Sequence, residues 1–149
     1  MNRGFTLIEL LLVIGILVIL MAATIVAINP FRQFALANNA ARWSGATTIM
    51  DAVYQNVVDN AGTFTCAAGV IPATATIMGS GTGQYNICSC LVPTYLSVMP
   101  HDPQTGSYTD CTTYNTGYNI SRDATTGRVI MCAPDTQIPP ETSTICVSR

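Results

Sequence analysis

The sequence predicts an α+β protein in which a long N-terminal helix packs on a small antiparallel β-sheet. Between Phe5 and Ile28, 20 of 24 residues are hydrophobic, which indicates a membrane-grade helix. Beyond Pro30 the apolar residues recur at helical spacing to about Asn60, so the helix is expected to continue past the apolar run. The remainder combines short β-prone segments with six cysteines, which is typical of a small cross-linked domain.

These observations divide the 149 residues into four segments. Residues 1–4 form a short polar, cationic leader, and residues 5–28 form the transmembrane half of the helix. Residues 29–61 form the amphipathic half, which continues into the head. Residues 62–149 form a β-rich globular head stapled by disulfides.

The composition excludes several classes of function. Charged residues make up 9% of the chain, against about 25% in a typical soluble domain, which excludes a disordered charged tail. The net charge of −2 and the sequence pI of about 5.0 disfavour a nucleic-acid partner. All six basic residues are Arg, so the chain has no Lys for a Walker-type phosphate loop or a Schiff base.

The apolar run is open to three interpretations. Residues 10–28 are 19 residues without a charge, nearly enough to span a hydrocarbon core of ~30 Å. A cleaved secretory signal peptide would have a shorter run without an acid, although Ala23 or Ala27 could end one. The other two interpretations are a plain membrane anchor and a helix that is retained for assembly.

The start of the chain resembles a known processing motif. The string Arg3-Gly4-Phe5-Thr6-Leu7-Ile8-Glu9-Leu10 closely resembles the prepilin motif of type IV pilins and type II secretion pseudopilins. The resemblance implies that a membrane aspartyl peptidase, the prepilin peptidase, cuts between Gly4 and Phe5 and methylates the new amine of Phe5. The apolar helix then stays on the protein, and Glu9 becomes the fifth residue of the mature chain.

Glu9 is an acid inside a membrane-grade segment, which makes it a candidate functional residue. In the simpler interpretation its carboxylate merely reaches the headgroups at the interface. In the interpretation that the resemblance favours, the carboxylate pairs with the Phe5 amine of a neighbouring subunit. Both charges would be desolvated in a helical bundle, so the pair would set the register of assembly.

Pro30 predicts a kink near Ile28, because proline lacks an amide donor and restricts the residue before it. The helical pattern then continues, and Gly62 is a plausible end. A core-facing stripe is predicted at Ala46, Ile49, Met50, Val53 and Val57, widened by Tyr54 and Val58. Arg42, Asp51, Gln55 and Asp59 are assigned to polar positions. The opposite, small-residue face is suited to contact neighbouring subunits and contains Ala35, Ala40, Ala41 and Gly45.

The head is expected to hold three or four antiparallel strands. The candidate segments are residues 84–88, 118–122, 128–132 and 144–147, with a hairpin turn over residues 123–127. A long helix on such a sheet resembles the ladle shape of pilins.

The cysteines are Cys66, Cys88, Cys90, Cys111, Cys132 and Cys146. Disulfides are favoured over zinc, because the spacing of Cys88 and Cys90 is too tight for a usual zinc knuckle and His101 is the only histidine. Six cysteines allow 15 pairings, so the residues alone do not choose among them. The resemblance to pilins, which often staple their last loop, suggests that Cys132 pairs with Cys146 around Pro139 and Pro140. Cys66–Cys88 and Cys90–Cys111 would then follow as local loops.

The stretch from Leu96 to Asp110 resembles a loop of major pseudopilins, some of which hold calcium there. Asp102 and Asp110 could supply oxygen ligands, but two carboxylates are few for a calcium site, and a capped proline-rich turn is favoured. We therefore expect no cofactor. His101 is assigned to a surface turn because no catalytic partner accompanies it. Asn119-Ile120-Ser121 fits the short N-glycosylation sequon.

The resemblance implies a non-enzymatic subunit of a type IV pilus-like filament that serves adhesion, motility or DNA uptake. The alternative is a pseudopilin of type II secretion, and a distant third is a secreted binding module or enzyme. The implied partners are copies of the chain, the prepilin peptidase, the lipid bilayer, and an inner-membrane assembly platform with its ATPase. The precursor would cross the bacterial cytoplasmic membrane once with its N-terminus inside, and the filament would be extracellular.

Overall fold

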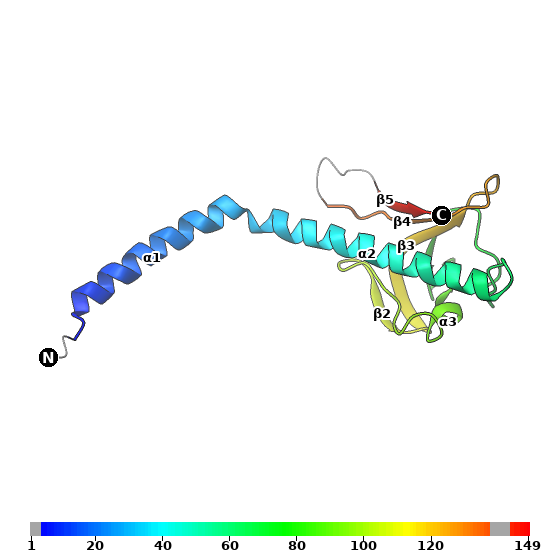
Figure 1. Cartoon of the computed structure of the whole chain (residues 1–149), viewed down its shortest axis with the longest axis horizontal. Helices are drawn as coiled ribbons and strands as arrows, with labels where there is room; N and C mark the ends of the chain where they lie inside the picture. The colour runs from blue at the N-terminus through cyan, green and yellow to red at the C-terminus, as the bar shows by residue number, and fades with distance from the viewer. Residues whose placement is uncertain (1–3, 138–143) are drawn as a thin grey trace. The chain divides into compact units, whose positions relative to one another are not determined.

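The computed structural model describes residues 4–137 and 144–149 (Figure 1). The chain forms two compact units, Met1–Phe34 and Ala35–Arg149. Helix α1 (Leu7–Ile28) belongs to the first unit. Most of helix α2 (Pro30–Asp59) and the whole sheet belong to the second, which is the head. The predicted α+β layout is confirmed.

The long helix is broken rather than merely kinked at Pro30. Helix α1 ends at Ile28, and Asn29 adopts a left-handed conformation with φ of 47° before Pro30 starts α2. Proline disfavours a helical conformation at the residue before it, and Asn tolerates the left-handed region better than most residues. The Asn29 carbonyl and side-chain oxygens both accept from the amide of Arg32, at 3.1 and 3.4 Å, so Asn29 serves both helix ends.

Helix α2 stops where the sequence predicts. Ala61 and Gly62 both have positive φ, at 55° and 90°, and the Gly62 amide donates to the Val57 carbonyl at 2.8 Å. This bond satisfies a carbonyl that the helix end would leave free.

The sheet has five antiparallel strands in the order β1-β3-β4-β5, with β2 also paired to β3. The strands are β1 (Thr76–Gly79), β2 (Ser107–Asp110), β3 (Thr113–Arg122), β4 (Val129–Ala133) and β5 (Ile145–Ser148). Strands β4 and β5 match the predicted segments to within one residue, and β3 begins five residues before its predicted segment. Strands β1 and β2 were not expected. Both are only four residues long and rich in polar or small residues, so they carry little β pattern of their own.

The strand predicted at residues 84–88 is wrong. Tyr85 makes only a single bridge to Met78, and the chain then enters a short helix, α3 (Cys88–Leu91). Tyr85 and Ile87 are buried on either side of an exposed residue, which mimics strand alternation. Tyr85 exchanges hydrogen bonds with the Ile77 carbonyl and the Gly79 amide of β1, at 2.9 and 3.3 Å. The pairing does not continue, since the Cys88 amide donates instead to the Tyr114 hydroxyl at 3.1 Å.

The core lies between α2 and one face of the sheet (Figure 1). On β3 the inward residues alternate, and they are Tyr114, Thr116, Tyr118 and Ile120. From α2 the predicted stripe residues Ala46, Ile49, Met50 and Val53 are buried. Val57 is half-buried and Val58 is 76% exposed, so the buried stripe of α2 is narrower than predicted near the C-terminal end of the helix.

Candidate functional site

Glu9 and Thr6 form a capping box at the start of α1. The Thr6 hydroxyl and backbone amide donate to Glu9 Oε2 at 2.7 and 2.9 Å, and the Glu9 amide donates to Thr6 Oγ1 at 3.4 Å. The carboxylate therefore accepts from a backbone amide that would lack a partner at the helix N-terminus, where the amide dipoles favour an anion. Sequence reasoning missed Thr6, although the Thr-x-x-Glu spacing is a known N-terminal signature.

The bond between Gly4 and Phe5, the predicted cleavage point, lies in non-helical chain before α1. Gly4 is exposed and Phe5 is 80% exposed, so this segment is open to a peptidase. The other leader residues, 1–3 including Arg3, lie outside the described residues. A cut here would place a new amine on Phe5, one residue before the helix cap.

Helix α1 buries none of its 22 residues. Its best window has a mean hydropathy of 3.1, and among the described residues it is the one helix long and apolar enough to cross a membrane. An exposed apolar surface of this size must be covered by lipid or by other protein chains.

In the head, a buried ion pair joins α2 to the loop before β2. Arg42 and Asp102 are both fully buried and make two contacts, Nε to Oδ2 at 2.5 Å and Nη2 to Oδ1 at 3.2 Å. Asn39 Oδ1 accepts from Arg42 Nη1 at 2.9 Å, and the amides of Gln104 and Thr105 donate to Asp102 Oδ1 at 2.8 and 3.1 Å. Both charges are thus paired and hydrogen-bonded, as burial requires.

The placement of Arg42 on a polar face was therefore wrong. Asn39, Arg42, Ala46 and Ile49 are all buried on one face of α2, with spacings of three and four residues. Arg42 therefore extends the predicted stripe by one turn. The helical spacing alone would have placed Arg42 on the buried face, but a charged residue is rarely buried without a partner. Its partner Asp102 lies 60 residues away in the sequence and could not be identified from the local pattern.

The pKa of Asp102 predicts an acid limit for the head. Burial would raise this pKa, but the hydrogen bonds from Arg42 and two backbone amides, with the Arg42 charge, bring it below its ordinary value. A lowered folded-state pKa stabilises the fold above the unfolded value of about 3.9, and that stability is lost as the pH falls through the folded pKa. We expect the melting temperature to fall steeply below about pH 4.

Circular dichroism melts between pH 2 and 7 measure this loss. Asp102→Asn is the matched variant, because it retains an oxygen for the two amides and cannot titrate. Its melting temperature should be lower at neutral pH and depend less on acid. An acid dependence as steep as that of the unmodified chain would contradict the assignment.

Gly45 lies against the sheet rather than on an outward small-residue face. A Cβ added at Gly45 would lie 2.8 Å from the Tyr118 hydroxyl oxygen, so the helix approaches β3 closely only because this residue is glycine. Burial raises the pKa of Tyr118 to about 12. The Tyr118 hydroxyl and Asn39 Nδ2 are buried without a hydrogen-bond partner within residues 4–137 and 144–149.

The two candidate calcium ligands have separate partners. Asp102 is engaged by Arg42, whereas Asp110 is exposed at the end of β2. Asp110 Oδ1 accepts from the Thr112 amide, the Thr112 hydroxyl and the Thr113 amide, at 2.8, 2.6 and 2.9 Å. The described part of the chain holds no group of three or more His, Cys, Asp or Glu able to bind a metal.

Three disulfides pair all six cysteines: Cys66–Cys90, Cys88–Cys111 and Cys132–Cys146. The structure joins Cys132 to Cys146, as suggested, and these residues face each other directly on β4 and β5. Pro139 and Pro140, in the loop between them, lie outside the described residues.

The other two suggested pairings are wrong, because Cys88 and Cys90 exchange partners. Residues two apart on a helical turn point in nearly opposite directions. Cys88 is buried in the core and joined to Cys111, whereas Cys90 is half-exposed and joined to Cys66.

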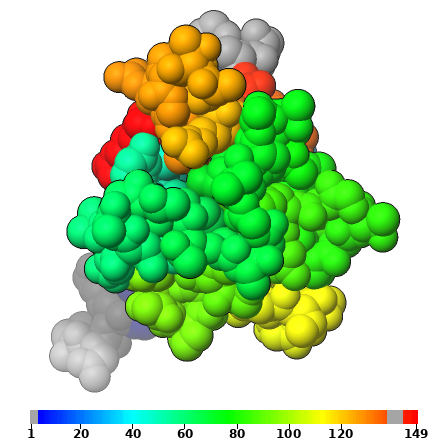
Figure 2. Space-filling view, turned by 90° about the vertical axis from the view of Figure 1, so that its right-hand side faces the viewer, coloured from blue at the N-terminus to red at the C-terminus, as the bar shows by residue number. Residues whose placement is uncertain are grey.

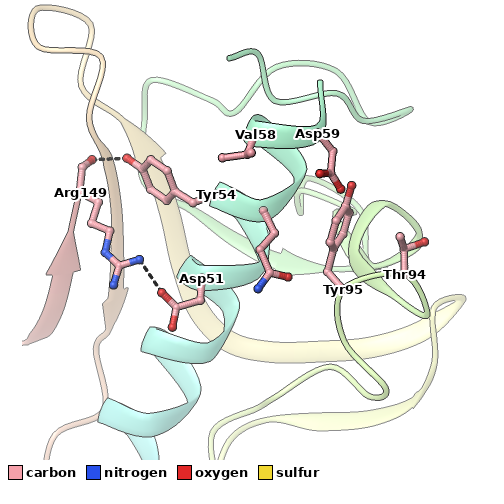
Figure 3. Close-up of a pocket in the computed structure, with 8 residues that line it drawn as sticks. Asp51, Tyr54, Val58, Asp59, Thr94, Tyr95 and Arg149 are labelled. Atoms are coloured by element: carbon pink, nitrogen blue, oxygen red, sulfur yellow. Dashed lines mark hydrogen bonds and ion pairs between the residues drawn. The ribbon is translucent and has the colours of Figure 1, made fainter. Parts of the chain in front are cut away.

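An open groove of about 630 Å³ lies along α2 near the C-terminus (Figure 3). Arg149 pairs with Asp51 at 2.5 Å, and its carbonyl accepts from the Tyr54 hydroxyl at 2.5 Å. On the other side of the helix, Tyr95 points toward Asp59 (Figure 3). Burial and the Asp59 carboxylate raise the pKa of Tyr95. These contacts fasten the chain end and the segment after α3 to the helix.

His101 and Asn119 have no catalytic partner among the described contacts. His101 is exposed, and its Nδ1 lies 3.4 Å from the Met99 carbonyl oxygen. Asn119 is half-buried on β3, paired with Ile77 on one side and Cys132 on the other. The sequon therefore lies on a central strand rather than in a loop.

A capped apolar helix without a core of its own, followed by a disulfide-linked α+β head, is the architecture of a pilin-type protein. Residues 1–25 match the family model described as the prokaryotic N-terminal methylation motif, which is the prepilin-type cleavage and methylation motif of type IV pilins and pseudopilins. The chain thus carries a prepilin-type N-terminus, and its layout is pilin-like. Comparison with curated proteins and with solved structures finds no match.

Proposed function

We propose that the chain is a structural, non-enzymatic subunit of a type IV pilus-like filament that serves adhesion, motility or DNA uptake. The prepilin peptidase cuts after Gly4 and methylates Phe5, and copies of the chain then assemble through α1. The observation that carries this proposal is the fully exposed α1, whose apolar surface starts directly behind the processing motif. In the precursor that surface is covered by lipid, and in the filament by other copies of the helix.

In the proposed assembly, Glu9 and the Phe5 amine form the register-setting pair. The amine of one subunit, created by cleavage, meets the Glu9 carboxylate of its neighbour inside the helical bundle. Because both charges are desolvated there, an assembly that leaves either unpaired is strongly disfavoured. The capping box supports this role, since it holds the carboxylate at the end of the helix.

The proposed path of the protein starts in the bacterial cytoplasmic membrane, with the N-terminus inside. An inner-membrane platform and its ATPase then extract the processed subunit into an extracellular filament. The three disulfides support an exported head, because such bonds persist in oxidising compartments.

Mass spectrometry of the purified protein tests the processing step. We expect a mature chain that begins at Phe5, carries one methyl group on its amine and retains the whole of α1. The control is Gly4→Ser, which should leave the precursor uncut in the membrane. A mature protein that begins after Ala23 or Ala27 would instead indicate a secreted module and would overturn the proposal.

The second candidate is a pseudopilin of type II secretion. This candidate is favoured by the loop from Leu96 to Asp110, which resembles a loop of pseudopilins. In that case calcium would stabilise the head and purified fibres would be short. The pairing of Asp102 with Arg42 argues for the pilus, because this carboxylate is already neutralised. Melting the head with calcium and with a chelator, alongside electron microscopy of fibre length, separates the two.

A further inference from the structure

We propose that neighbouring heads in the filament contact each other through two turns of opposite charge. Asp110, the last residue of β2 beside the β2–β3 turn of one subunit, faces Arg128, in the turn between β3 and β4 of the next. The inference rests on the proposed function, because only a polymer of this chain brings the two turns together. A helical polymer requires two different surfaces on each subunit that complement one another.

The two turns lie on opposite sides of the head. They are joined by β3, whose ten residues at about 3.4 Å each separate them by roughly 30 Å. Figure 2 shows them at opposite margins of one face, with the β3–β4 turn in orange at the top and the β2–β3 turn in yellow at the lower right. A head placed beside another in the same orientation therefore presents one turn toward the other.

The acidic turn is rigid and keeps one carboxylate oxygen free. Asp110 is exposed, and its three hydrogen bonds from Thr112 and Thr113 all go to Oδ1. Within the described residues Oδ2 has no hydrogen-bond partner. The adjacent Cys111 is tied to Cys88 on α3, which fixes the turn to the core.

The basic turn is closed by its own backbone. The Asp123 amide donates to the Arg128 carbonyl, and the Gly127 amide donates to the Asp123 carbonyl, both at 2.9 Å. Arg122 Nε donates to the Gly127 carbonyl at 3.2 Å, whereas the guanidinium of Arg128 is exposed and meets no partner in the part of the chain that the structure describes. Arg122 at the end of β3, together with Asp123 and Arg128 of the turn, gives this end of the hairpin one net positive charge.

Opposite charge and rigidity together favour a second copy as the partner. The backbone of each turn is already held by hydrogen bonds, so contact has to order little beyond the Arg128 side chain. A single exposed pair contributes little, but a filament repeats it at every subunit. Opposite potentials also select the orientation in which the heads meet.

Charge reversal in the full-length protein tests the contact. Arg128→Glu and Asp110→Lys should each lower the yield of sedimentable filaments about tenfold, because like charges would then face each other. Combining both substitutions in one chain restores opposite charges at every contact and should recover most of the yield. The control is Gln55→Lys, which adds positive charge at an exposed residue of α2 outside both turns.

Asp110→Lys also removes bonds within its turn, so Asp110→Asn accompanies it, since Asn keeps the Oδ1 acceptor without the charge. We expect an intermediate yield from Asp110→Asn and a wild-type melting temperature for Arg128→Glu. Wild-type yields from Arg128→Glu, or a double variant no better than the single ones, would overturn the contact and leave the proposed function standing. A wild-type chain that is processed but never sediments would overturn the proposed function itself.

Discussion

Glu9→Ala should abolish filaments while leaving the processed protein in the membrane. In a bundle of α1 helices, the Phe5 amine of each subunit would lose its counter-ion, and an uncompensated buried charge costs about 3–5 kcal/mol. That cost corresponds to roughly two to four orders of magnitude in the affinity for the growing end. Sedimentation and electron microscopy of sheared filaments, with immunoblots of the membrane fraction, measure the effect.

Glu9→Ala also removes the carboxylate half of the capping box, although Thr6 Oγ1 can still accept from the amide of residue 9, so a second variant separates the two roles. Glu9→Gln offers Thr6 the same side-chain acceptor and carries no charge. If charge pairing drives assembly, Glu9→Gln should fail as completely as Glu9→Ala. Normal filaments from Glu9→Gln would show that the residue acts only as a cap and would contradict the register pair.

Arg42→Ala should lower the free energy of unfolding of the head by about 3–5 kcal/mol. The substitution leaves the Asp102 carboxylate fully buried without its cation. It also removes the hydrogen bond that Arg42 Nη1 donates to Asn39 Oδ1. Denaturant titration followed by the fluorescence of Trp43, the single tryptophan and a neighbour of Arg42 on α2, measures the loss. Because assembly requires a folded head, filament yield should fall as well.

The chain offers a matched comparison for this pair. Arg149 and Asp51 have the same separation of 2.5 Å but are about half exposed. Arg149→Ala should therefore cost less than about 1 kcal/mol. The double variant Arg42→Met with Asp102→Asn removes both charges and should recover much of the stability lost in Arg42→Ala. Equal losses for Arg42→Ala and Arg149→Ala would contradict the role given to burial.

Features that depend on neighbours in the chain could be read from the sequence. The apolar run, the processing motif, the proline break and the glycine stop after α2 each involve a few consecutive residues. The core-facing stripe from Ala46 to Val53 was also predicted, because helical periodicity needs no knowledge of the partner surface. The hairpin at residues 123–127 followed from turn chemistry in the same way.

Features that depend on distant residues could not be read in this way. Strands β1 and β2 hold four residues each and are stabilised by pairing with β3 rather than by their own pattern. The exchange of partners between Cys88 and Cys90 follows from α3, a helical turn in place of the predicted strand. The capping box was a local feature that sequence reasoning nevertheless missed, since the Glu9 carboxylate was considered only as a group at the headgroup interface or as an assembly contact.

The sequence by itself determined the prepilin-type start of this protein, because the processing motif and the apolar helix behind it consist of consecutive residues. Only the tertiary structure decided that Arg42 is a core residue, that Asp102 is its counter-ion and that Gly45 faces Tyr118. A buried charge is strongly destabilising unless a group of opposite charge lies beside it, and only the fold brings that group into contact. Residue type and spacing identify one residue of such a contact, whereas its partner is known only from the folded chain.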